Sequence, residues 1–105
     1  MKYYVYVIRL DEMVLKHKKF RQSNPNLDPE LSCYYVGQSC HPPETRFWQH
    51  KNGYKSNNYA KKYGLGLCPQ YYDHINPIKT RKDAERIEEE VTKTLRNMGH
   101  GVWSH

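Results

Sequence analysis

A chain of 105 residues is long enough for one modest hydrophobic core but not for two, so we expect a single domain. The formal net charge of +6 indicates an acidic partner, and nucleic acid is the commonest such partner of a basic domain. No apolar run approaches the roughly 20 residues that span a bilayer, and the start has no signal-peptide pattern, so we expect a cytoplasmic protein without a membrane partner.

Tyrosine is the unusual residue, with ten copies against two phenylalanines. A phenol can pack on one side and stack on a base with the other, which favours a nucleic-acid surface over core filling alone. The cysteines Cys33, Cys40 and Cys68 form no C-x-x-C pair, so neither a disulfide framework nor a four-ligand zinc site is expected. A zinc site that adds His41 to these cysteines is a minor alternative.

The first predicted element is a strand from Tyr3 to Leu10, which has almost no polar alternation and therefore fits a central strand buried on both faces. We expect it to pair with a strand from Cys33 to Gln38. The phenols of Tyr6 and Tyr35 would then emerge side by side at one face of the sheet. The alternative is that Tyr6 is an ordinary core residue.

Residues 11–32 are predicted to form a basic insertion on the surface. A short helix is expected from Asp11 to Lys19, with Val14 and Leu15 facing inward, followed by turn residues around Pro25 and Pro29. The insertion carries the most basic run of the chain, and its cations are candidates for phosphate contacts: Lys16, Lys18, Lys19 and Arg21. The alternative is a solvated charged face.

The stretch from Cys33 to His50 is the main candidate for chemistry, and it is predicted to form a strand, a glycine turn and a helix. Gly37 allows a bend or a close backbone approach, and Pro42-Pro43-Glu44 opens the helix. Arg46 and His50 are four residues apart and lie on one helical face. A guanidinium that binds phosphate and an imidazole that moves a proton would point toward the tyrosines, a set suited to phosphodiester chemistry. The alternative is a solvated helix face beside core tyrosines.

The middle of the chain predicts a short helix and an edge strand. Gly53 is expected to end the preceding helix, and a helix over residues 57–63 is enclosed by Ser56 as N-cap and Gly64 as stop. Further nucleic-acid contacts are predicted at Lys51, Tyr59, Lys61, Lys62 and Tyr63, unless the two tyrosines instead dock this helix on the core. Leu67 to Ile75, interrupted by Pro69, is predicted as a third strand at the sheet edge.

The clearest helix is predicted from Thr80, a plausible N-cap, to Met98, just before Gly99. At 100° per residue its apolar stripe is Ala84, Ile87, Val91, Leu95 and Met98. Glu88 falls inside this stripe. An ionised carboxylate on a core-facing line costs several kcal/mol unless it meets a cation, so either a salt bridge to an arginine or a metal ion is expected there.

Four elements in this order resemble the GIY-YIG nuclease superfamily, and in particular its small single-domain members. The elements are Tyr4-Val5-Tyr6, Tyr35-Val36-Gly37, the Arg-x-x-x-His of Arg46 and His50, and Glu88 before an apolar-x-Lys run. The chain departs from the family pattern in three ways. Tyr4 replaces the leading glycine, the segment between the two triplets is long, and an asparagine after the last helix is not evident in residues 99–103.

The resemblance implies an α/β fold over residues 1–105, with a small, mainly antiparallel three-stranded sheet flanked by helices. It also implies a metal-dependent endonuclease that hydrolyses phosphodiester bonds, with DNA favoured over RNA; whether that DNA is single-stranded, duplex or branched stays open. Glu88 would hold one divalent cation, Mg²⁺ or else Mn²⁺, and Arg46 would neutralise charge on the phosphate.

For the general base the resemblance favours Tyr6, with Tyr35 orienting the water or the phosphate. His50 is the more natural base by its ordinary pKa, so it is kept as a relay that takes the proton from Tyr6. Two other functions remain open: a nucleic-acid-binding module that keeps the fold without cleaving, and a basic structural protein of a ribonucleoprotein.

Overall fold

A four-stranded sheet in the order β3-β1-β2-β4 is the centre of the computed structural model, which describes residues 1–104. β1 pairs antiparallel with both β2 and β3, whereas β4 runs parallel to β2. The α/β class is confirmed, but the prediction of three mainly antiparallel strands is wrong because the sheet has a fourth strand and is mixed. The strands are β1 (Tyr4–Leu10), β2 (Cys33–Ser39), β3 (Gly64–Leu67) and β4 (Gly101–Trp103).

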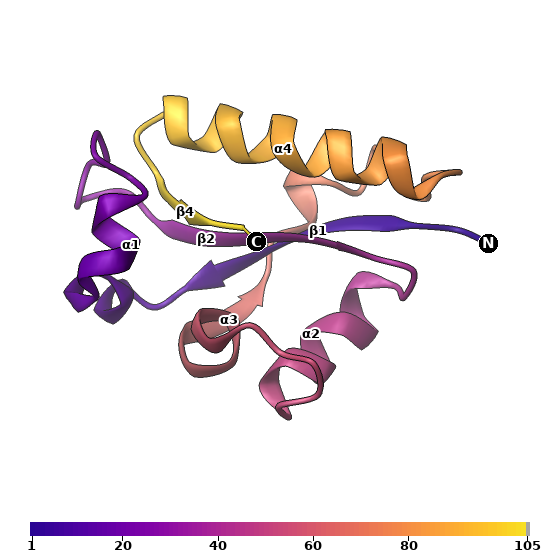
Figure 1. Ribbon diagram of the computed structural model, residues 1–105, viewed down its shortest axis with the longest axis horizontal. Coiled ribbons are helices and arrows are strands. Elements are labelled where there is room, and N and C mark those ends of the chain that lie inside the picture. Colours follow the sequence, from indigo (N-terminus) through magenta and orange to yellow (C-terminus); the bar gives the residue numbers. More distant parts are fainter. Residues whose placement is uncertain (105) are drawn as a thin grey trace.

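Helices cover both faces of this sheet (Figure 1). α4 (Arg81–Asn97) lies against one face, while α1 (Lys18–Gln22), α2 (Pro43–Lys51) and α3 (Asn58–Tyr63) lie against the other. Two short 3₁₀ helices, η1 (Glu12–Lys16) and η2 (Pro69–Tyr71), complete the chain. In residues 1–104 no helix is both long and apolar enough to cross a membrane.

β1 and β2 occupy the two central positions, as predicted. Residues 5–8 of β1 and 33–37 of β2 are buried, because helices pack on both of their faces. Successive side chains of a strand point to opposite faces, so Tyr6 and Tyr35 share the face that α2 covers, while Tyr34 contacts His100 on the α4 side. The prediction that the phenols of Tyr6 and Tyr35 emerge together is confirmed.

β4 is the strand that the sequence did not predict. It is held by side chains rather than by its own strand propensity: the buried Asn24 accepts hydrogen bonds through Oδ1 from the backbone N–H of Val102 (2.9 Å) and from Nε of Arg96 (3.0 Å). Arg96 also donates through Nη2 to the carbonyl of Val102 at 2.9 Å. A strand of three residues that depends on such distant partners has no signature in its local sequence.

Residues 11–32 are more than a surface insertion. Val14 and Phe20 are fully buried, and the ring of Phe20 packs against Tyr59 of α3 and Trp103 of β4. The single helix predicted from Asp11 to Lys19 is instead two short helices, η1 and α1, which meet at His17. The segment therefore contributes to the core, while its lysines remain exposed.

The third strand lies earlier in the chain than predicted. β3 covers Gly64–Leu67, and the residues expected to continue it form η2 from Pro69. Proline fixes φ near the helical value and lacks an N–H, which suits the first turn of a helix better than a strand. The predicted edge position is confirmed, since β3 is the outermost strand beside β1.

The predicted helix ends are largely confirmed. Thr80 caps α4 by accepting the Asp83 N–H through Oγ1 at 3.1 Å, and the chain leaves α4 and α2 at Gly99 and Gly53, whose φ angles are +101° and +80°. The cap of α3 is Asn57 rather than Ser56. The apolar stripe of α4 ends at Leu95, because Met98 is 57% exposed.

The register of β1 and β2 gives a stability prediction. Gly37 lies opposite Tyr6, and a Cβ at Gly37 would overlap the phenol of that side chain. Gly37→Ala should therefore lower the free energy of unfolding by about 1 to 3 kcal/mol, because the buried Tyr6 has to shift. Gly66→Ala is the matched control in β3, where a Cβ meets nothing within 4 Å. Equal urea midpoints for the two variants would contradict the prediction.

Candidate active site

A cavity of about 300 Å³ lies where β1, β2 and α2 meet. It brings together four residues that the sequence predicted as catalytic, namely Tyr6, Tyr35, Arg46 and His50. The remaining lining residues come from the end of β2 and from the loop before α3, and they are Gln38, Lys55, Ser56 and Asn57.

The aromatic rings of this cavity are in contact across neighbouring elements. The ring centroids of Tyr6 and Tyr35 are 6.3 Å apart, and the imidazole of His50 lies 5.9 Å from the first and 5.3 Å from the second. His50 is buried and sits one helical turn after Arg46 in α2, so the predicted shared helical face is confirmed.

The hydrogen bonds of His50 define its tautomer. The backbone N–H of Asn57 donates to Nδ1 at 3.1 Å, so Nδ1 carries a lone pair and the proton of the neutral ring is on Nε2. Nε2 lies 2.9 Å from the hydroxyl of Tyr6 and therefore donates to it. The relay predicted for His50 requires Nε2 to accept the proton of Tyr6, and this tautomer does not allow it.

Burial raises the pKa of both phenols. Tyr6 is 1% exposed, and desolvation holds its pKa far above the ordinary value, with a further increase from Tyr35 that the charge of Arg46 opposes. Burial, then the charge of Glu88, raises the pKa of Tyr35 to about 12, whereas Arg46 and a hydrogen bond from Tyr6 lower it. Tyr35 is thus the phenol that loses its proton more readily.

Arg46 is held in place by the loop that follows α2. Its guanidinium donates to the carbonyls of Tyr54 and Lys55 and to Oε1 of Gln49. Lys55 has a positive φ of 44°, which is uncommon for a residue other than glycine. The hydrogen bond from Arg46 to the carbonyl of Lys55 helps to hold this backbone conformation. The cation is therefore fixed beside the two tyrosines, whose pKa values its charge lowers.

Glu88 lies at an adjoining cavity on the α4 side, and Gln38 lines both cavities. Glu88 is only 7% exposed, and its Oε2 is buried without a hydrogen-bond partner in residues 1–104. Burial, followed by the charges of Glu85 and Glu89, raises its pKa to about 7. The predicted core-facing position of this carboxylate is confirmed.

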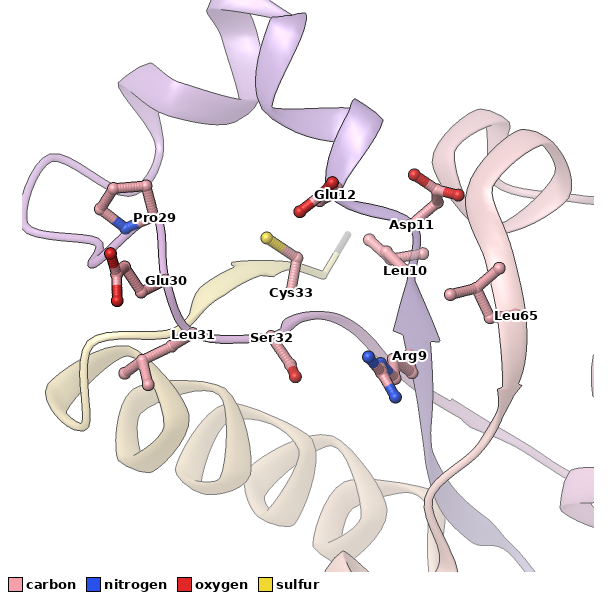
Figure 2. Close-up of a pocket in the computed structure, with 10 residues that line it drawn as sticks. All are labelled: Arg9, Leu10, Asp11, Glu12, Pro29, Glu30, Leu31, Ser32, Cys33 and Leu65. Atoms are coloured by element: carbon pink, nitrogen blue, oxygen red, sulfur yellow. The ribbon is translucent and has the colours of Figure 1, made fainter.

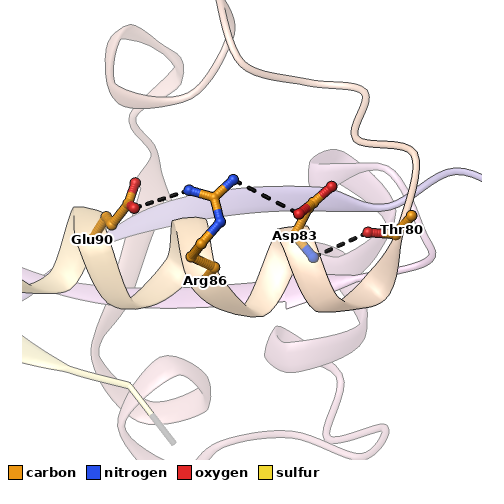
Figure 3. Close-up of polar contacts among 4 residues, drawn as sticks. All are labelled: Thr80, Asp83, Arg86 and Glu90. Atoms are coloured by element: carbon orange, nitrogen blue, oxygen red, sulfur yellow. Dashed lines mark hydrogen bonds and ion pairs between the residues drawn. The ribbon is translucent and has the colours of Figure 1, made fainter.

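The salt bridge considered for Glu88 is absent from residues 1–104. The guanidinium of Arg86 lies between Asp83 and Glu90, at 3.7 and 2.9 Å, on the outer face of α4 (Figure 3). The other arginine toward the end of this helix, Arg96, is bound to Asn24 and Val102. The neighbouring arginines of α4 are therefore engaged elsewhere.

The unpartnered oxygen of Glu88 fits a hard divalent cation, which prefers oxygen ligands. The amide of Gln38 lines the same cavity and offers a second oxygen. No group of three or more His, Cys, Asp or Glu side chains that could hold a metal occurs in residues 1–104, so the zinc arrangement with His41 is not formed there. Glu88 and Gln38 are the residues of this cavity that could hold such a cation.

The predicted phosphate contacts divide into two groups. The cations that remain exposed are Lys16, Lys18, Lys19 and Arg21 near α1, and Lys61 and Lys62 on α3. These helices lie on the same side of the sheet as α2 (Figure 1). Arg21 also donates to the carbonyl of Leu15 at 2.7 Å.

Three predicted nucleic-acid contacts have structural roles instead. Tyr63 is buried and hydrogen-bonded to His17, and Tyr59 is half-buried against Phe20 and Trp103, so both tyrosines dock α3 on the core. Nζ of Lys51 donates to the carbonyls of Lys61 and Gly64 at 2.8 and 2.9 Å, which ties α2 to the end of α3. The docking by the two tyrosines is the alternative given by the sequence, whereas the contacts of Lys51 have no signature in local sequence.

The sequence missed several residues of the site. Gln38 directly follows Gly37, and its place at the end of a strand is the signal that could have found it. Lys55 and Asn57 belong to a loop whose path depends on the carbonyl contacts of Arg46 and on the N–H of Asn57. Trp48 and Tyr54 are exposed aromatics beside that loop.

Another cavity, at the far end of the β1–β2 pair, does not offer this chemistry (Figure 2). Its walls include the carboxylates of Asp11, Glu12 and Glu30 against the single guanidinium of Arg9, a balance that repels phosphate. Burial raises the pKa of the Cys33 thiol, and Glu12 adds to this, so the thiol stays protonated and is a poor nucleophile.

No family model, curated protein or solved structure matches this chain. The GIY-YIG resemblance therefore remains a prediction that rests on the residues themselves.

Glu88 gives a prediction about stability that is independent of function. Between about pH 4.5 and 7 the folded protein keeps a proton on Glu88 that the unfolded chain has lost, so stability falls as pH rises through this window. Glu88→Gln removes the titration and should be more stable than the wild type at pH 8 by roughly 1 to 3 kcal/mol, with little gain at pH 4.

Urea unfolding at pH 4, 6 and 8 measures this difference. Glu90→Gln is the matched control, because it makes the same change at an exposed position of α4 and should show no gain that grows with pH. Parallel pH profiles for Glu88→Gln and the wild type would contradict the assignment.

Proposed function

We propose that this protein is a divalent-metal-dependent endonuclease that hydrolyses phosphodiester bonds, with DNA as its substrate. The main support is Glu88, whose buried and unpartnered oxygen adjoins a cavity that contains two phenols, a guanidinium and an imidazole. A buried carboxylate without a cation destabilises a fold, and such groups with perturbed pKa values cluster at functional sites.

Arg46 has the role of stabilising charge on the phosphate. A phosphodiester in the cavity places its oxygens near the guanidinium, which suits the geometry of a phosphate group. Because the carbonyls of Tyr54 and Lys55 already hold the side chain, it needs no rearrangement as negative charge develops.

The hydrogen-bond order favours Tyr35 over Tyr6 as the base. The N–H of Asn57 donates to His50, His50 donates to Tyr6, and Tyr6 donates to Tyr35, so a phenolate is best supported at the end of this series. The Tyr35 phenolate would take a proton from water as the water oxygen attacks phosphorus and the bond to the leaving oxygen breaks. That oxygen is then protonated from solvent.

A phenol with a pKa of about 12 is mostly protonated at neutral pH and needs added positive charge to act as a base. Glu88, with Gln38 beside it, would hold a divalent cation, and such a cation would supply that positive charge and Lewis-acid chemistry when bound.

The protonated phenols also favour a second candidate function, a module that binds nucleic acid without cleaving it. With the pKa values of both tyrosines above neutrality, the cavity can hold a phosphate through neutral hydrogen-bond donors together with Arg46 and Lys55. The two functions differ in whether a bond is broken.

A nicking assay on supercoiled plasmid and single-stranded circular DNA separates the two candidates. We expect cleavage with Mg²⁺ and none with a chelator, and a rate lower by a factor of about 100 or more in Arg46→Ala and Glu88→Gln. Mg²⁺ should also raise the melting temperature of the wild type but not of Glu88→Gln.

Glu90→Gln is the control for both measurements and should behave as the wild type. A folded Glu88→Gln protein that still cuts with Mg²⁺ would sink the proposed mechanism, and wild-type binding without cleavage would support the binding module.

The exposed basic residues near α1 give a prediction about salt dependence. Replacing Lys16, Lys18 and Lys19 by glutamine should weaken binding to all DNA sequences and reduce the slope of log affinity against log salt by up to about 3. A second triple variant at Lys55, Lys61 and Lys62 reports on the basic residues nearer the cavity. An unchanged slope in the first variant would show that the α1 lysines are a solvated face.

A further inference from the structure

We propose that Tyr54, with Lys55 beside it, forms a rim that stacks on an unpaired nucleobase, so that the substrate strand is single-stranded where it enters the site. The inference rests on the proposed function for its phosphodiester chemistry. It adds the class of nucleic acid, which neither the sequence nor the cavity itself specifies.

Two aromatic side chains of the described residues are exposed. Trp48 is 63% exposed and Tyr54 is 55% exposed, and in residues 1–104 every other Phe, Tyr and Trp side chain is buried or half-buried. Trp48 lies two residues after Arg46 in α2 and therefore on the opposite side of that helix, whereas the carbonyl of Tyr54 is bound to Arg46. Tyr54 is thus the exposed ring that is connected to the cavity. Aromatic rings stack on any base, and each stacked base typically contributes about 1 to 3 kcal/mol.

Tyr54 is held in position by its backbone. After Gly53 the chain turns back onto α2, where the N–H of Tyr54 donates to the carbonyl of Gln49 at 2.8 Å and its own carbonyl accepts from Arg46 at 3.1 Å. The ring is thus presented on an anchored turn rather than on a free loop, which lowers the entropy lost when a base stacks on it.

Lys55 links this ring to the cavity. Its side chain lines the cavity with Arg46, and its Nζ lies 5.6 Å from the centroid of the Tyr54 ring. A phosphate near Arg46 and Lys55 therefore places its adjoining nucleoside within reach of Tyr54. In a duplex the faces of each base are covered by neighbouring base pairs, so stacking on a protein ring requires an unstacked base.

The surroundings of the rim favour a nucleic acid over a protein partner. The exposed neighbours of Trp48 and Tyr54 in the sequence are polar or basic, including Lys51, Asn52 and Lys55. The other large exposed apolar side chains belong to the N-terminus, η1, the loop before β2, β3 and the end of α4: Met1, Met13, Leu31, Leu65 and Met98. The basic residues next to Tyr54 in the sequence suit an acidic polymer such as nucleic acid.

Binding to oligothymidylate of about 12 nucleotides, alone or paired with its complement, tests the proposal with chelator present. Fluorescence anisotropy of labelled DNA should show tighter binding to the single strand. Tyr54→Ala should weaken single-strand binding by a factor of about 5 to 150 and leave duplex binding nearly unchanged. Tyr54→Phe keeps the ring and should restore affinity, whereas Met98→Ala, a change at a similarly exposed position, should have no effect.

Trp48→Ala gives a second control. It removes the other exposed ring, on the far side of α2 from Arg46, and should leave single-strand affinity unchanged. Failure to bind the single strand overturns the proposal. So does unchanged affinity in Tyr54→Ala, which would assign the exposed rings to a protein contact.

Because these measurements need no cleavage, the two proposals fail separately. Stacking that depends on Tyr54, without nicking in Mg²⁺, supports the rim and rejects the nuclease. Nicking that persists in Tyr54→Ala with unchanged affinity rejects the rim alone.

Discussion

The packing of Tyr6 over Gly37 is the contact on which the site depends. Because Gly37 has no side chain, the phenol of Tyr6 can lie against β2 and reach the imidazole of His50 on α2. His50 is in turn oriented by the N–H of Asn57, whose side chain caps α3. One close approach in the sheet therefore aligns donors from β1, from α2 and from the N-cap of α3, and a side chain at position 37 would disturb all of them.

The short length of β4 explains how two faces of the sheet act on one site. β4 pairs only with Cys33–Tyr35, so within residues 1–104 the end of β2 from Val36 to Ser39 has no partner strand on that side. Gln38 lies in this open part and lines the cavities on both faces. The charge of Glu88 consequently raises the pKa of both tyrosines, although it belongs to the helix on the opposite face.

The features predictable from the sequence were those encoded within a few residues. The cap at Thr80, the glycine after α2 and the carboxylate inside the apolar stripe of α4 all follow from local spacing. β4 could not be predicted in this way, because it is held by the side chain of Asn24, which lies far away in the sequence. The tertiary contacts of Lys51 were not predictable for the same reason, whereas the docking of α3 through Tyr63 is the alternative that the sequence left open. The tautomer of His50 depends on the path of a loop.

The protonation states of the site affect both its attraction for phosphate and the loss of a phenolic proton. Near neutral pH the phenols are protonated and Glu88 is half-titrated, so the cavity carries the positive charge of Arg46 with little negative charge against it. That state attracts a phosphodiester but does not favour loss of a phenolic proton. Ionised Glu88 raises the pKa of Tyr35, so the carboxylate opposes the base unless its charge is balanced. Under the proposed function, a cation at Glu88 would balance this charge and lower the pKa of Tyr35. The carboxylate on one face of the sheet would then control the phenol on the other face.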